Sequence, residues 1–139
     1  MKLRHRPIEK EIKPLVEILN EVPYIETYSS CRGHYRSGNP QKQRATVHFK
    51  VEAEHEKDFE DLAAFVLAQT APTWHQALVQ IFKEFYVMPD ETDLKTHYLI
   101  AIKPFKDVRS SGAKRKYTNR AIRKATEATR QYLDQNANR

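Results

Sequence analysis

Ala45-Thr-Val-His-Phe-Lys-Val-Glu52 carries the clearest structural signal in this chain of 139 residues, because its apolar and polar side chains alternate. Val47 and Phe49 would lie on one face of a strand, and His48 and Lys50 on the other. Such alternation is typical of a strand that is half buried in a sheet. Residues 24–30 are rich in strand-forming Tyr, Ile and Thr, so we expect them to pair with it.

The N-terminal segment predicts a helix over residues 8–19, where apolar side chains recur at helical spacing. Pro7 suits its first position, and Glu9 and Glu11 suit its first turn. Pro14 lacks a backbone N–H and must either kink this helix or begin a second one.

Further along, the pattern indicates in turn a helix over 58–69, a strand over 74–88, a partner strand over 96–103, a loop over 104–112, a helix over 117–133 and a frayed tail over 135–139. Residues 74–88 also fit a helix, but their β-branched and aromatic content favours a strand. The expected order is α-β-β-α-β-β-α in a single domain, residues 1–139. This order predicts an α+β fold: a mostly antiparallel sheet of about four strands with helices on one face.

The composition indicates a soluble cytoplasmic protein without a membrane partner. No apolar run is long enough to span a bilayer, the basic start at Met1 is not followed by the apolar segment of a secretory signal, and one cysteine suits a reducing compartment. The net charge is +6, and residues 103–139 hold 11 of the 24 Lys and Arg but only 3 of the 18 Asp and Glu. Such a basic region suggests an anionic partner such as RNA, although it also fits a solvated basic surface.

The end of the first predicted strand reads as a binding site, because hydroxyl, basic and glycine residues crowd together where a strand gives way to a loop. Backbone amides around Gly33 can form an anion site, and Arg32 and Arg36 can fork onto a phosphate, while Lys42 and Arg44 return on the next strand. The expected ligand-binding residues are Ser29, Ser30, Cys31, Arg32, Gly33, His34, Arg36 and Arg44. The alternative is a strand end whose hydroxyls only satisfy loop amides.

Cys31 admits two further interpretations. It can act as a nucleophile with His34 as its base, although a lone cysteine at a strand end is more often a small packed residue. Cys31 and His34 are also half of a zinc site that His48, His75 or His97 would have to complete, and no metal is expected because a second ligand pair is missing. We interpret His48 as an exposed residue, with proton transfer as the alternative role.

The string Thr27-Tyr-Ser-Ser-Cys-Arg-Gly-His34 resembles the Ser-Ser-Cys-Ser-Gly-Arg motif of the wybutosine-synthesis tRNA methyltransferase family. The matching positions are Ser29, Ser30, Cys31 and Gly33, whereas Arg32 and His34 replace a serine and an arginine of the family. The resemblance implies a role in tRNA modification and a pocket for S-adenosylmethionine. Small uncharacterised bacterial proteins with a Ser-Cys-x-Gly-His string also look similar.

We therefore expect a domain that binds a phosphate-bearing ligand, most plausibly RNA, at the loop after the first strand. Tyr28 and Tyr35 can stack on bases if they are exposed. A nucleic-acid surface would continue over the basic C-terminal residues Lys114, Arg115, Lys116, Arg120 and Arg123. The alternatives are a protein-interaction module that uses this basic helix and a small enzyme that uses Cys31 with His34.

Overall fold

A computed structural model describes residues 8–137 of the chain, so the expectations for Met1 to Pro7, and for Asn138 and Arg139 of the tail, lie outside the described residues. Three helices and four strands follow one another in the predicted order, and the α+β fold is confirmed. They are α1 (Lys13–Glu21), β1 (Ile25–Cys31), β2 (Ala45–Val51), α2 (Glu56–Thr70), β3 (Ala77–Tyr86), β4 (Lys95–Pro104) and α3 (Ser111–Asn136), with short 3₁₀ helices η1 (Pro40–Gln43), η2 (Ala53–His55) and η3 (Ala71–Thr73).

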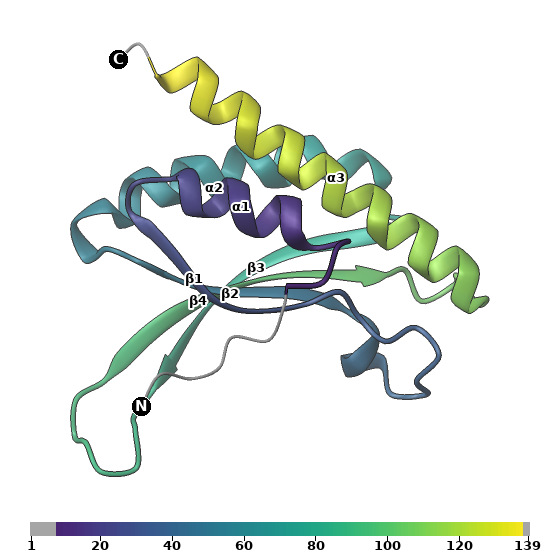
Figure 1. Cartoon of the computed structure of the whole chain (residues 1–139), viewed down its shortest axis with the longest axis horizontal. Coiled ribbons are helices and arrows are strands. Elements are labelled where there is room, and N and C mark those ends of the chain that lie inside the picture. The colour runs from purple at the N-terminus through teal and green to yellow at the C-terminus, as the bar shows by residue number, and fades with distance from the viewer. Residues whose placement is uncertain (1–7, 138–139) are drawn as a thin grey trace.

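The four strands form one antiparallel sheet in the order β1-β2-β4-β3. The predicted pairing of the first two strands is confirmed, and residues 74–88 contain the strand β3, as their composition indicated. The three helices lie on one side of the sheet, and the turn between β3 and β4 extends away from them (Figure 1). None of the three α-helices covers the opposite face of the sheet, which we call the open face.

The core fills the space between the sheet and the three helices. The apolar face predicted for β2 is confirmed, since Val47 and Phe49 are buried beneath the helices. Alanines on α3 bring that helix close to its neighbours. The buried residues include Leu15, Ile18 and Leu19 from α1, Phe59, Leu62 and Val66 from α2, Ile100 and Ile102 from β4, and Ala121, Ile122, Ala125 and Ala128 from α3.

The predictions for two helix starts were wrong. Helix α1 begins only at Lys13, with Pro14 in its first turn. Pro14 therefore stands at the start of a helix and does not kink one. Glu9 and Glu11 consequently precede the helix rather than occupy its first turn. Helix α3 begins at Ser111, because the Ser110 side chain caps it by accepting a hydrogen bond from the Ala113 N–H at 3.0 Å.

The same helix also ends later than expected. It continues through Gln135 and Asn136, which the sequence assigned to a frayed tail. The side-chain amide of Asn136 donates to the carbonyl of Tyr132 at 2.7 Å and so supports the last turn.

Strand β1 contains a β-bulge at Tyr28. Thr27 lies opposite Phe49 and Ser29 lies opposite His48, so Tyr28 is an extra residue in β1. Beyond the bulge, Ser30 pairs with Val47 on the helix side, and Cys31 pairs with Thr46 on the open face.

Candidate functional site

The open face carries a pocket of about 600 Å³ where β1 ends and β2 begins. Its walls come from the end of β1, from the loop that follows, and from the first half of β2. Of the described residues that line it, none is acidic. The lining residues are Cys31, His34, Ser37, Gln41, Lys42, Arg44, Thr46 and His48.

The loop that frames the pocket is held by Gly33. Its φ of +95° lies in the region that residues with a side chain rarely adopt. A Cβ at this position would come within 2.8 Å of the Tyr35 hydroxyl and 3.0 Å of the Gln43 carbonyl. Tyr35 is only 7% exposed and donates a hydrogen bond to the Arg32 carbonyl, and burial raises its pKa to about 12. Tyr35 therefore supports the loop, and its ring is too buried to stack on a base.

Cys31 and His34 meet inside the pocket. The Cys31 Sγ lies 3.6 Å from the His34 Nε2, and the Gly33 N–H donates to the same sulfur at 3.4 Å. The backbone N–H of His34 donates to the Lys42 carbonyl at 2.6 Å, which ties the loop to the segment leading into β2. The structure thus brings Cys31 and His34, which the sequence analysis assigned to one site, into direct contact.

Arg32 has partners outside the pocket. Its Nε lies 3.0 Å from the Glu9 Oε2, and its Nη1 lies 3.3 Å from the Glu11 Oε1. Its backbone N–H also donates to the Glu9 Oε1 at 2.9 Å. A backbone N–H of Glu11 and the Arg32 guanidinium lower the pKa of the Glu11 carboxyl. Arg32 therefore fastens the segment before α1 to the end of β1, instead of forking with Arg36 onto a ligand.

The structure brings together only some of the predicted ligand-binding residues: Cys31, His34 and Arg44 line the pocket, as does Lys42. Ser29 is exposed beside it, Ser30 faces the helix side, Gly33 supports the loop and Arg36 is exposed.

None of the five basic residues expected to form a nucleic-acid surface lines the pocket either. The Lys114 Nζ donates to the Gln43 Oε1 at 3.2 Å, so the start of α3 reaches the same loop, whereas the Arg120 Nη1 donates to the distant Gln76 Oε1 at 3.3 Å.

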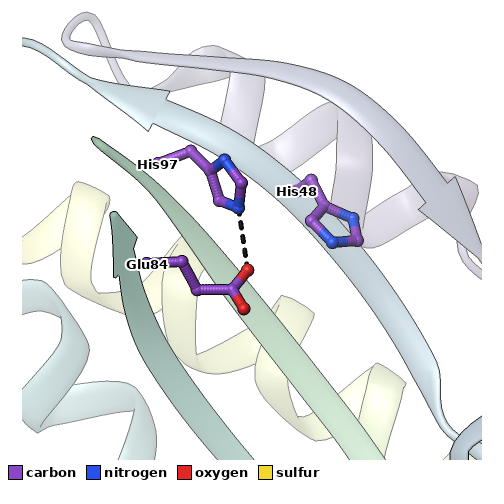
Figure 2. A group of neighbouring side chains, drawn as sticks. All are labelled: His48, Glu84 and His97. Carbon is purple, nitrogen blue, oxygen red and sulfur yellow. Dashed lines mark hydrogen bonds and ion pairs between the residues drawn. The ribbon is translucent and has the colours of Figure 1, made fainter. Parts of the chain in front are cut away.

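A second cluster adjoins the pocket on the open face and consists of His48 on β2, His97 on β4 and Glu84 on β3 (Figure 2). The His97 Nε2 lies 2.7 Å from the Glu84 Oε1, and each of the three residues offers one ligand atom within 4.8 Å of the others. The rings of His48 and His97 are 5.7 Å apart, and Tyr28 lies about equally close to both.

The prediction that His48 is simply exposed was wrong. His48 is half-buried, and its Nδ1 is buried without a hydrogen-bond partner. Burial lowers the pKa of His48, with a smaller contribution from the nearby His97 in the same direction, and this favours the neutral imidazole. Leu99 lies directly opposite His48 and is only 2% exposed, so the imidazole has one apolar neighbour beside its polar ones.

Sequence reasoning missed the contributions of Ser37, Gln41 and Thr46 to the pocket, and the proximity of Glu84 to His97. Polar loop residues such as Ser37 and Gln41 give no signal of the direction in which they point. Glu84 and His97 could have been paired by aligning residues 74–88 antiparallel with 96–103, where they fall directly opposite one another.

Comparison with protein-family models, with curated proteins and with solved structures finds no match to this chain. Within residues 8–137, no helix has the length and apolar character that crossing a membrane requires.

Proposed function

We propose that this chain binds single-stranded RNA on the open face of its sheet, with a phosphate in the pocket beside Lys42 and Arg44. The observation that supports this best is the charge of the pocket: two cations, two imidazoles and neutral polar groups, with no acidic residue among its described lining residues. A phosphate oxygen is the acceptor that such a set of donors suits.

The two cations are available to a ligand. In the described part of the chain, neither Lys42 nor Arg44 forms an ion pair, whereas Arg32 pairs with both Glu9 and Glu11. An unpaired cation beside a pocket attracts anions without first losing an internal partner. A volume of about 600 Å³ is also in the range of pockets that hold small ligands, so a nucleotide and not only its phosphate can enter.

Tyr28 supplies an aromatic surface next to the pocket. The bulge places it on the open face, where it is 46% exposed and its ring centroid lies 6.0 Å from that of His48. An exposed tyrosine on a strand is a platform on which a base can stack, and stacking contributes about 1 to 3 kcal/mol per base. Phosphate binding at Arg44 and stacking at Tyr28 together describe an unpaired strand and not a duplex.

The test is fluorescence anisotropy with labelled single-stranded RNA of about ten nucleotides, measured over a range of salt concentrations. A sequence from transfer RNA is the first choice, because the resemblance of residues 27–34 implies tRNA modification. We expect the double variant Lys42→Ala with Arg44→Ala to weaken binding and to reduce the salt slope by about 0.7 for each phosphate that the two side chains neutralise in the wild type. Tyr28→Ala should weaken binding with little change in that slope.

The matched control is Arg120→Ala with Arg123→Ala, which removes the same charge from α3. Unchanged binding in this control, with weakened binding in the pocket variant, supports the proposal. The reverse result would reject it in favour of a separate basic-helix surface, and the same readout with an acidic protein in place of RNA would then test the protein-interaction alternative.

A second candidate function is a thiol-dependent enzyme, which the 3.6 Å contact between the Cys31 Sγ and the His34 Nε2 favours. An imidazole at this distance can take the thiol proton, and the Gly33 N–H can stabilise the resulting negative sulfur. Alkylation with iodoacetamide tests this. Rapid reaction of Cys31 near neutral pH that slows in His34→Gln supports the candidate, and slow reaction of both proteins would exclude it. A thermal-shift measurement with S-adenosylmethionine tests the cofactor that the resemblance implies.

A further inference from the structure

The cluster of His48, Glu84 and His97 has the composition of a metal centre. Its members come from three neighbouring strands, β2, β3 and β4, and project from the same face of the sheet (Figure 2). Two imidazoles and one carboxylate are a ligand set that binds divalent transition metals in proteins. Strand pairing fixes the positions, since Glu84 lies directly opposite His97, and His48 lies opposite Leu99, two residues further along β4.

The distances allow one ion to reach all three side chains. One ligand atom from each residue lies within 4.8 Å of the other two. Zinc ligands stand about 2.0 to 2.2 Å from the ion and therefore about 3.3 Å from each other in a tetrahedral site. The 2.7 Å contact between the His97 Nε2 and the Glu84 Oε1 would open slightly, and the His48 ring would move closer. Side-chain rotations are enough, because the strands already hold the backbones in place.

His48 supplies an independent observation. Its Nδ1 is buried and has no hydrogen-bond partner among the described residues. Buried polar atoms are nearly always paired, so an orphan nitrogen needs a partner that the described protein atoms do not provide. A metal ion bound directly to this nitrogen supplies such a partner.

We propose that His48, Glu84 and His97 bind one divalent transition-metal ion of the zinc type. Three protein ligands leave at least one coordination position open. His48 also lines the pocket, so that position adjoins Lys42 and Arg44. This proposal does not depend on RNA binding. The sequence suggested His48 and His97 as completions of a zinc site at Cys31 and His34, and it did not single out Glu84.

One other group in the described chain has ligand atoms as close together, and it provides the control. Glu52, Glu54 and His55 lie within a single short segment, and the two glutamates are exposed. His55 already contacts Asp58 at 3.0 Å and stacks on Tyr24 with ring centroids 5.0 Å apart. Its imidazole therefore has partners, whereas the His48 nitrogen lacks one.

The experiment is titration of the metal-free full-length protein with Co²⁺, followed by its visible absorption, and with Zn²⁺, followed by calorimetry and native mass spectrometry. We expect one ion per chain. His48→Gln and His97→Gln should each weaken binding by about 100-fold or more, since losing even a residue that only supports a ligand costs 10- to 100-fold. Glu84→Gln should weaken it less, because the amide keeps an oxygen at the position of the carboxylate, although this oxygen is a poorer ligand. His55→Gln and His75→Gln should bind like the wild type.

Circular dichroism of each metal-free variant separates a binding defect from a folding defect, because all three side chains lie on the open face and their replacement should leave the melting curve nearly unchanged. The proposal is overturned if the wild type takes up no ion at one equivalent, or if His48→Gln and His97→Gln bind as the wild type does. A defect in His55→Gln alone would assign binding to the Glu52–His55 segment and would equally overturn it. Failure of RNA binding in the assays described above would leave these outcomes unaffected.

Discussion

Two hollows of similar size lie on opposite sides of this molecule and differ in charge. The groove between α1 and α3, about 720 Å³, is lined by Glu17, Glu21, Glu127 and Asp134, with Arg130 as its one described cation. The pocket on the open face of the sheet, about 600 Å³, has Lys42 and Arg44 and no described acidic residue. Size alone would rank the helix groove first, but charge separates the two.

The difference is that the cation of the groove is paired within the chain, whereas the two cations of the pocket are not. In the groove, the Arg130 Nη2 lies 2.6 Å from the Glu21 Oε2, and this pair links the two helices across the hollow. In the pocket, Lys42 and Arg44 have no carboxylate partner among the described residues. A cation without an internal partner is the better indication of an external anion, so the smaller hollow is the stronger candidate for a phosphate site.

Reversing one charge in each hollow should give the largest contrast. Arg44→Glu should lower the affinity for single-stranded RNA by about 100-fold, since a hydrogen bond to a charged group contributes about 1.5 to 3 kcal/mol and repulsion is added. Arg130→Glu places the same change in the groove and should leave the affinity unchanged. Anisotropy titrations of both variants measure the two affinities. Equal losses would mean that the net charge of the protein, rather than the pocket, governs RNA binding.

A glycine exchange tests whether the pocket depends on the shape of its loop. Gly33→Ala should lower the free energy of unfolding by about 2 to 3 kcal/mol, because a positive φ is strained for alanine and the new Cβ would press against Tyr35 and the Gln43 carbonyl. Gly38 lies in the same loop with nothing within 4 Å of its Cβ position, so Gly38→Ala should change stability by less than about 0.5 kcal/mol. Urea denaturation of both proteins gives the comparison, and a harmless Gly33→Ala would contradict the described loop.

Acid should weaken the contacts of the Glu11 carboxylate, which include Arg32, with a smaller effect. The folded pKa of Glu11 lies below its ordinary value of 4.5, so its stabilising contribution is complete above about pH 4.5 and is lost as the pH falls through the lowered folded pKa. The loss should be at most about 1 kcal/mol, because the ion pair is partly solvated. Denaturation of the wild type and of Glu11→Gln at pH 6 and pH 3 should show a smaller pH dependence in the variant. An equal reduction in Glu60→Gln, an exposed control on α2, would argue against a specific anchor.

The smallest effect is expected from breaking the ion pair of the groove. Arg130→Ala should leave both the unfolding midpoint and the RNA affinity at wild-type values, since Arg130 and Glu21 are each about half exposed and water replaces their contact. Thermal melting and the anisotropy assay check this together. A clear fall in RNA affinity would show that the groove takes part in the function after all.

Sequence patterns were sufficient for the elements but only partly for the site. Alternation in residues 45–52 and composition in 74–88 predicted strands that the structure confirms, because each pattern is local and repeats along the segment. The site depends on contacts between distant segments. Nothing local in the sequence signals that Glu9 engages Arg32, or that β4 inserts between β2 and β3 and so carries His97 toward His48.

The predictions of helix starts failed for a related reason. The charges of Glu9 and Glu11 suit the first turn of a helix, but they suit an ion pair with an arginine some twenty positions away equally well. Pro14, not those charges, fixed where α1 begins. A sequence pattern identifies the kind of residue that a position prefers, but the competing partner appears only when the chain has folded.

The bulge at Tyr28 adds an aromatic side chain to the open face without changing the pairing on either side of it. Removing this one residue would close the bulge, and Thr27 would still lie opposite Phe49 and Ser29 opposite His48. Cys31 would keep its place opposite Thr46, so the thiol would stay on the open face. A chain with one fewer residue in this strand would therefore keep the sulfur of the pocket and lose only the aromatic platform, so the two parts of the candidate site can be gained or lost separately.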